Sequence, residues 1–234
     1  MPKPSRRRRE NLAMAPEKPL PVASAIATLK KFKGPKFDQA VEVCLHLGVD
    51  VKQVDQALRG SVSLPHGIGK SKKVVAFCSS DDVAAAKEAG AIEAGGEDLV
   101  QKIEGGWMDF DVAVATPDMM RVISKLGRVL GPKGLMPSPK AGTVTKNVPE
   151  AVKEYAAGKV EYRTDKSGNV HAVVGKMSFA EGQLLENLEH FVETIVKLRP
   201  SSVKGLYVKK IAISGTMTPG IELEQTEGVF GATA

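Results

Sequence analysis

The spacing of apolar residues changes twice along the chain, and this limits the folds that the chain can adopt. Between residues 37 and 47 every large apolar side chain occupies an odd-numbered position, while Glu42 and His46 occupy even-numbered ones. Such alternation is typical of a strand with one buried face, which leaves the other face free for binding. Residues 74–77 are instead apolar without interruption, which is typical of a strand buried on both faces. The outer and middle parts of the chain therefore predict sheets of different kinds.

The middle of the chain predicts a small parallel sheet covered by helices. A second apolar run, residues 110–115, follows two segments with helical character, and a further helix is expected up to residue 126. Strands that alternate with helices are typical of domains with parallel sheets. We therefore predict a Rossmann-like α/β domain over residues 67–158.

The two ends of the chain together predict one α+β domain. Residues 159–163, 170–174 and 206–213 have the composition of strands, and the apolar residues between 184 and 196 form one stripe of a long helix. These pieces join the alternating strand, so the predicted domain is discontinuous. It comprises residues 1–66 and 159–234, and the Rossmann-like domain is inserted in it. The predicted fold class is thus α/β and α+β, in two domains.

Two short glycine-containing segments mark the predicted crossings between the domains. They are His66-Gly67 on the way into the insertion and Gly158-Lys159 on the way out. Glycine absorbs backbone rotation without steric cost, and hinges are built from a few such residues. We expect these four residues to act as a hinge.

Charge is segregated along the chain. The formal net charge is +6, but residues 1–36 hold ten Lys or Arg against two Glu, and residues 81–118 hold ten acids against two Lys. Residues 121–146 hold six basic residues and no acid. Basic blocks of this kind favour a polyanionic partner. Residues 1–21 show no hydrophobic period, so we expect an arm that is poorly ordered without a partner.

Motifs for catalysis and for cofactors are weak. The segment from Gly67 to Ser71 resembles the tail of a phosphate-binding loop, but Leu64 stands where that loop requires glycine. No G-x-G-x-x-G segment is present, and the four histidines lack metal-ligand spacing. We therefore predict no catalytic residues, no metal and no cofactor. A nucleotide-binding enzyme on the Rossmann-like domain stays as an alternative function, and a nucleic-acid scaffold as a third class.

The sequence contains no signal for a membrane or for export. No apolar stretch approaches the roughly 20 residues that a membrane helix needs, and no signal peptide is visible. Cys44 and Cys78 fit neither a disulfide framework nor a metal motif. We expect two reduced cysteines, a cytoplasmic protein and no membrane partner.

Several motifs together resemble the L-one family of large-subunit ribosomal proteins, of the bacterial type. They include Gly105-Gly106-Trp107-Met108-Asp109-Phe110-Asp111, the segment Leu126–Pro137 with its Gly-Pro-Lys-Gly core, and Thr216-Met217. The resemblance runs from about Ala25 to Glu222 in the expected order. It implies a structural constituent of the large subunit that binds rRNA at the mobile stalk beside the tRNA exit site.

The same resemblance implies further partners. They are the exit-site tRNA, whose release the protein assists, the mRNA of its own operon, whose translation it represses, and other large-subunit components. It also implies that the terminal domain carries the main RNA surface. Position by position, that surface maps to Lys36, Phe37, Glu42, His171, Lys176, Ser214, Thr216, Met217 and Gly220.

The middle domain is expected to add secondary RNA contacts through a basic loop rich in Pro and Gly, at Arg128, Lys133 and Lys140. The chain departs from the family pattern at two positions of the 214–220 loop. Gly215 stands where Ser or Thr is usual, and Thr218 where Gly is usual. Glycine lets RNA approach the backbone closely, so Thr218 is the departure expected to matter most.

Overall fold

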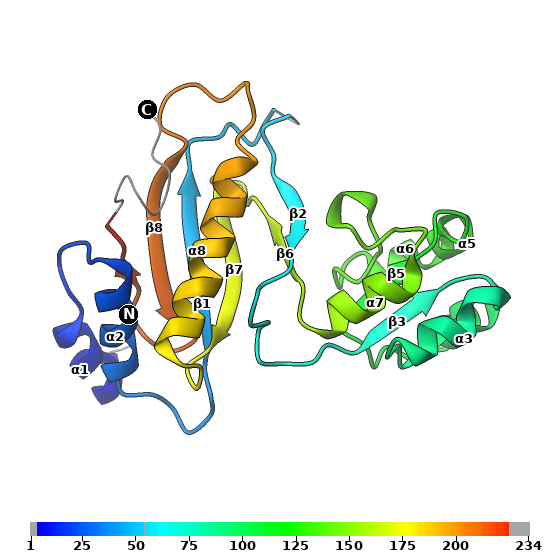
Figure 1. The fold of residues 1–234 in the computed structure, drawn as a ribbon, viewed down its shortest axis with the longest axis horizontal. Helices are drawn as coiled ribbons and strands as arrows, with labels where there is room; N and C mark the ends of the chain where they lie inside the picture. Colours follow the sequence, from blue (N-terminus) through cyan, green and yellow to red (C-terminus); the bar gives the residue numbers. More distant parts are fainter. Residues whose placement is uncertain (1–3, 54, 225–234) are drawn as a thin grey trace. The chain divides into compact units, whose positions relative to one another are not determined.

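The computed structural model of this chain describes residues 4–53 and 55–224, and the chain divides into two compact units. One unit consists of residues 1–69 with 160–234, and the other of residues 70–159 (Figure 1). The division falls three residues after the first crossing predicted from the sequence and one residue after the second. The mixed α/β and α+β character predicted for the chain is confirmed.

The first unit is organised around a four-stranded antiparallel sheet with strand order β7-β1-β8-β9. The strands are β1 Ala40–Leu47, β7 Asn169–Lys176, β8 Val208–Gly215 and β9 Ile221–Glu222. Strand β1 pairs with β7 on one side and with β8 on the other along almost its whole length. It is therefore the strand that fixes the register of its neighbours.

The predicted alternation in β1 is confirmed, with one difference at its start. The odd-numbered residues from Val41 to Leu47 are at most 1% exposed, and the even-numbered ones are half-buried. Phe37 shares the odd parity but is 54% exposed. It precedes the strand, which begins only at Ala40, so the alternation does not extend to it.

Two helices cover the buried face of this sheet. They are α2 Val22–Lys31 and α8 Glu181–Lys197, and Figure 1 shows α8 in front of β1 and β7. Their apolar stripes join Val41, Val43, Leu45 and Leu47 of β1 in one hydrophobic core. The opposite face of the sheet carries the half-buried or exposed side chains of Glu42, Cys44, His46 and His171. We call this second surface the open face.

A second, two-stranded sheet belongs to the same unit. It pairs β2 Arg59–Val62 with β6 Val160–Arg163 in antiparallel register, with Val62 opposite Val160. Tyr162 of β6 packs edge-on against Phe191 of α8, so this sheet shares the core of the first. The pairing also brings the chain entering the other unit close to the chain leaving it.

The N-terminal segment differs from its prediction. Residues Arg6–Met14 form helix α1. Asn11 anchors this helix: its side chain is fully buried, donates to the Lys33 carbonyl and accepts from the Lys33 amide, both at 3.0 Å. The expectation of a poorly ordered arm was wrong for these residues, because a polar anchor leaves no hydrophobic period in the sequence.

The second unit has a parallel sheet, as the sequence predicted for this part of the chain. It has three strands in the order β4-β3-β5, of which β4 was not predicted. Its strands are β3 Val74–Phe77, β4 Glu93–Gly95 and β5 Val112–Ala115. Its helices are α3 Ser80–Glu88, α4 Glu97–Glu104, α5 Met120–Ile123, α6 Gly127–Leu130 and α7 Val148–Ala156, with 3-10 turns at Ser124–Leu126 and Pro139–Ala141. Both β3 and β5 are buried along their whole length, because α3 and α7 pack on one face and α4 to α6 on the other.

The predicted hinge residues are held by hydrogen bonds within their own units. Fully buried Asn187 of α8 accepts from the His66 amide at 3.0 Å and donates to the Gly67 carbonyl at 3.0 Å and the Val174 carbonyl at 2.8 Å. Gly158, at φ 103°, ends α7, and its amide donates to the Tyr155 carbonyl at 3.1 Å. A hinge role for His66, Gly67, Gly158 and Lys159 stays a prediction.

We predict that Asn187→Ala destabilises the first unit by roughly 2–4 kcal/mol. The substitution leaves the buried Val174 carbonyl and the partly buried His66 amide and Gly67 carbonyl without their partner. Each such group costs about 1–3 kcal/mol when water cannot replace the bond. Denaturant unfolding followed by circular dichroism measures the loss. His190→Ala is the control, because His190 is exposed on the same helix and its removal should cost less than about 0.5 kcal/mol. Equal losses for the two variants would contradict the structural role of Asn187.

Candidate nucleic-acid interface

Three chain segments meet at one end of the four-stranded sheet. The loop before β1 contains Lys36 and Phe37, the turn after β7 begins at Lys176, and the loop after β8 spans residues 215–220. The register places them together, since Ala40 lies opposite Lys176 and Val41 opposite Gly215. The antiparallel sheet thus gathers most of the RNA-binding residues predicted from the sequence, and we call this region the sheet end.

Buried Gln39 ties these three segments together. Its side-chain oxygen accepts from the Met217 amide at 2.9 Å, and its backbone carbonyl accepts from the Met177 amide at 2.9 Å. The side chain is only 3% exposed. Gln39 was not predicted from the sequence. Its position could have indicated a role, because it is a polar residue at an odd-numbered position of the alternating strand pattern, where the large residues are otherwise apolar.

Two further contacts fix the loops. Asp38 accepts from the Ser178 hydroxyl at 2.8 Å, so this serine positions the turn after β7 and does not cap α8. The Thr216 hydroxyl accepts from the Ala40 amide at 3.1 Å, and the Thr216 amide donates to the Ala40 carbonyl at 3.1 Å. Thr216 therefore holds the 215–220 loop against β1 and keeps an acceptor lone pair for another partner.

Two large apolar side chains are presented to solvent by this scaffold. Phe37 is 54% exposed and Met217 is 51% exposed. Each lies beside an element anchored by Gln39 or Thr216, so neither needs to order a loop in order to bind. Exposed aromatic and thioether groups at the same sheet end as Lys36 suit a partner that offers both flat apolar surfaces and negative charge.

The open face continues this surface along β1. Glu42 lies opposite Ser214, and Cys44 lies opposite His171. At the far end of the face, the Asp165 carboxylate accepts from the Asn169 and Ser167 amides, both at 2.8 Å. The Asn169 amide is the main reason why the pKa of Asp165 is lowered below its ordinary value, so this carboxylate stays ionised near neutral pH.

The neighbouring Cys44, His171 and Asp165 do not form a nucleophile with its base. The Cys44 sulfur lies 4.0 Å from His171 Nε2, and the same nitrogen lies 3.9 Å from Asp165 Oδ2. Burial, followed by the negative charge of Asp165, raises the pKa of the Cys44 thiol. A raised pKa keeps the thiol protonated, which is the opposite of what a catalytic cysteine needs. Among residues 4–53 and 55–224, no cluster of His, Cys, Asp and Glu could hold a metal ion.

The two departures in the 215–220 loop are in direct contact with each other. The Thr218 hydroxyl accepts from the Gly215 amide at 2.8 Å. A Cβ at position 215 would lie 3.0 Å from this hydroxyl oxygen and 3.5 Å from Gln39 Oε1. Glycine at 215 thus leaves the room that the threonine at 218 occupies, so the two departures fit one another.

The predicted secondary residues lie in the second unit. Arg128 on α6, together with Lys133 and Lys140 in the loop that follows, is exposed. Fully buried Tyr155 holds this loop by donating its hydroxyl hydrogen to the Ala141 carbonyl at 2.7 Å. The Pro- and Gly-rich segment therefore has a fixed attachment to the core of its unit.

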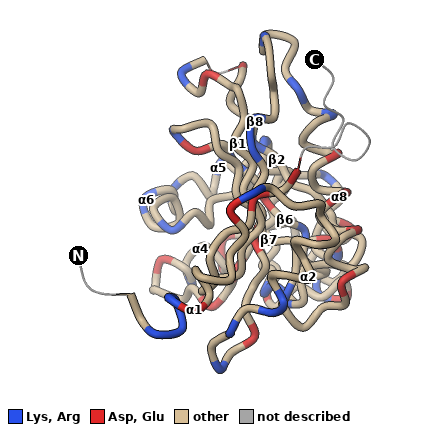
Figure 2. Tube along the Cα trace, turned by 90° about the vertical axis from the view of Figure 1, so that its left-hand side faces the viewer, with Lys and Arg blue, Asp and Glu red and all other residues tan. Residues whose placement is uncertain are grey.

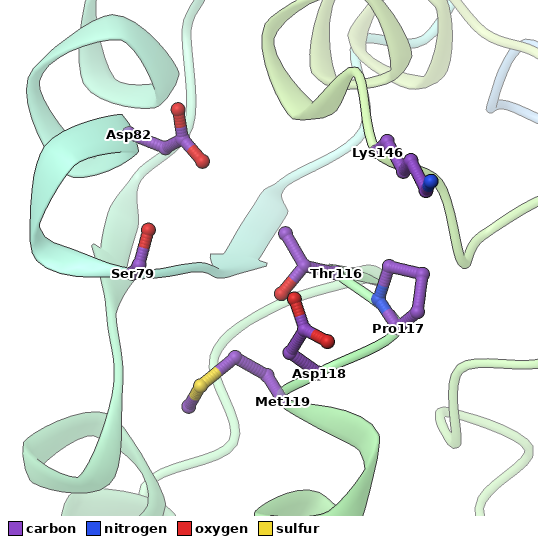
Figure 3. Close-up of a pocket in the computed structure, with 7 residues that line it drawn as sticks. All are labelled: Ser79, Asp82, Thr116, Pro117, Asp118, Met119 and Lys146. Carbon is purple, nitrogen blue, oxygen red and sulfur yellow. The ribbon is translucent and has the colours of Figure 1, made fainter.

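A cavity of about 210 Å³ bears on the nucleotide-binding alternative. It lies beyond the carboxyl ends of β3 and β5, where doubly wound domains bind ligands. Figure 3 shows the carboxylates of Asp82 and Asp118 at this cavity, with Lys146 as the basic residue of its lining. Two carboxylates repel a phosphate group, and Ser79 begins a turn without glycine. The lining therefore disfavours a nucleotide.

The fold is that of a discontinuous α+β unit with an inserted α/β unit, and basic and exposed apolar side chains lie at one end of its four-stranded sheet. The model of the Ribosomal protein L1p/L10e family matches residues 29–219, most of the chain, and the chain belongs to this family. It is therefore a structural protein of the large ribosomal subunit that binds RNA, and the family implies the cytoplasmic ribosome as its location. In the part of the chain that the structure describes, no helix is long and apolar enough to span a lipid bilayer.

We predict that the effect of Gly215→Ser depends on residue 218. In the presence of Thr218, the new Cβ displaces the hydroxyl from the Gly215 amide and should weaken RNA binding by about 1 kcal/mol. In a Thr218→Gly background the same substitution should have little effect, because the space is empty. Titration of the four proteins with one rRNA fragment gives the coupling energy. Additive effects would show that the two positions act independently.

Proposed function

We propose that the sheet end and the open face bind the rRNA of the mobile stalk beside the tRNA exit site. The observation that carries this proposal is the pair of half-exposed apolar side chains at the sheet end, Phe37 and Met217. Phe37 follows Lys36 in the chain, and the Met217 amide donates to the buried Gln39 side chain. A protein that exposes such groups on a rigid scaffold gains binding energy without paying for loop ordering. Sequence-specific RNA recognition commonly uses stacking on unpaired bases and contacts to ribose, which these side chains suit.

Each residue of the surface has a distinct proposed role. Lys36 and Lys176 neutralise phosphates, and the Glu42 carboxylate accepts from a 2′-hydroxyl or an exocyclic amine. Phe37 stacks on a base, Met217 packs over a ribose, and exposed Gly220 allows close approach of the RNA backbone. Ser214, His171 and Thr216 offer further hydrogen-bonding groups to sugar and base edges.

The finer biological roles that the family resemblance implies are part of the same proposal. A fold in the mRNA of the protein's own operon that imitates the stalk would compete for the sheet end, so free protein would repress translation only after rRNA is saturated. Arg128, Lys133 and Lys140 would add contacts to the stalk or to the exit-site tRNA, and rotation near Gly67 and Gly158 would let the stalk assist tRNA release. We propose that the protein does this without catalysing a reaction.

We predict that Phe37→Ala and Met217→Ala each weaken binding to the stalk RNA by about 1–3 kcal/mol, the scale of a lost apolar anchor. The dependence on salt should not change, because neither side chain releases counterions. Leu206→Ala is a matched control: Leu206 is 53% exposed in the same unit, but it precedes β8, whereas Met217 follows it. Filter binding to the stalk RNA and to an unrelated hairpin measures all three.

The controls separate three outcomes for this prediction. Loss of stalk-RNA binding in the Phe37 and Met217 variants, with Leu206→Ala unchanged, supports the sheet end. Equal weakening on both RNAs would show that these side chains do not specify the target. Full affinity in both variants would remove the sheet end from the proposed function.

A further inference from the structure

Helix α1 opens with four consecutive arginines, Arg6 to Arg9, and this is an unfavourable place for them. The N-terminal end of a helix carries a partial positive charge, which acidic side chains usually offset. The first turn of α1 contains no acid. Glu10 does pair with Arg6 at 3.0 Å and with Lys33 at 2.7 Å. Arg8 and Arg9 are exposed and have no ion pair within residues 4–53 and 55–224.

The helix is nevertheless held in place on the first unit. The two reciprocal hydrogen bonds between Asn11 and the Lys33 backbone lock it to the end of α2. Arg8 lies three residues before Asn11, so both sit on neighbouring turns of the same helix. A helix of mostly basic and polar residues gains little from apolar burial, so this polar lock is what fixes the direction of its arginines.

The point of attachment is close to the proposed RNA surface. Lys33 precedes Lys36 by three residues, and three residues span at most about 11 Å. Lys36 and Phe37 begin the sheet end, so Asn11 brings α1 to within one short segment of it. Figure 2 shows the basic α1, in blue, on the side of the strands away from α8, which is the side of the open face. The matched family residues begin at 29, so α1 lies outside them.

We infer that docked α1 is a second RNA-contacting element, which places Arg8 and Arg9 against phosphates of the RNA strand that leaves the sheet end. The inference rests on the proposed function, because the same RNA must occupy Phe37 and Met217. Arginine forms paired hydrogen bonds with phosphate, and a phosphate at this position also offsets the positive end of the helix. The contact is to the RNA backbone, so it adds affinity and carries no sequence preference.

The test is a salt titration of RNA binding by the full chain. Arg8→Gln/Arg9→Gln should reduce the slope of log K against log salt by about 1.5–2 and weaken binding at least about tenfold near 0.1 M salt. The charge-matched control is Lys52→Gln/Lys204→Gln. These lysines are exposed at the opposite end of β1 and β8, so the slope should stay within about 0.5 of wild type.

A second variant tests the docking itself. Asn11→Ala keeps every arginine and removes both hydrogen bonds to the Lys33 backbone, which leaves only the exposed Glu10–Lys33 ion pair to hold the helix. Binding should therefore weaken about threefold to tenfold. The melting temperature should change little, because detachment of α1 lets water reach the Lys33 backbone groups. Unchanged RNA affinity in Asn11→Ala would overturn the need for a docked helix. If Arg8→Gln/Arg9→Gln changes neither the RNA affinity nor the slope of log K against log salt, the inference is overturned. An acidic protein would then be the partner that the arginines fit.

The two proposals fail in different ways. If Phe37→Ala and Met217→Ala lose stalk-RNA binding while the arginine variant does not, the sheet end is the RNA site and α1 is not part of it. If the arginine variant loses affinity while the Phe37 and Met217 variants keep it, the proposed function is overturned and this inference fails with it.

Discussion

The pairing of strand β1 with a neighbour on each side is the constraint on which the first unit depends. Because β1 is held by β7 and β8, its odd-numbered residues must face α2 and α8, and its even-numbered residues must face away from them. A shift of register by one residue would bury Glu42 and expose Val41 and Val43. The same pairing brings the loops at residues 36–39 and 215–220 to one end of the sheet. Core formation and site assembly therefore have a common cause.

The sequence predicted the helices and strands better than the buried polar side chains that hold distant segments together. Alternation identified β1, uninterrupted apolar runs identified β3 and β5, and one apolar stripe identified α8, because burial of side chains sets these periods directly. Asn11 and Asn187 were missed: each is a single buried amide whose partners lie more than 20 residues away or on another element. Hydrogen bonds between distant segments leave no periodic trace, and this is why the N-terminal helix was expected to be poorly ordered.

The candidate site was also predicted only in part: its exposed residues were identified, but the residues that position them were not. Resemblance to a family supplied Lys36, Phe37, Thr216 and Met217, and the register of the sheet explains how residues 180 positions apart in the sequence share one surface. It did not supply Gln39, whose side chain holds the Met217 amide from beneath the surface. Nor did it explain the change from the family pattern at 215 and 218, which becomes intelligible only as a contact between the two residues. Residues that position others are visible in the structure rather than in the motif.

Whether RNA covers the open face of the first unit is tested most directly by the reactivity of Cys44 in the unmodified protein. Cys44 is half-buried on the open face beside His171, whereas Cys78 is fully buried. The rate of alkylation is measured by mass spectrometry at one fixed pH, with saturating stalk RNA, with an unrelated hairpin and with no RNA. Alkylation of the buried Cys78 would show that the protein has unfolded. If RNA covers the open face, stalk RNA alone slows modification of Cys44. An equal rate of Cys44 modification with and without saturating stalk RNA would contradict it.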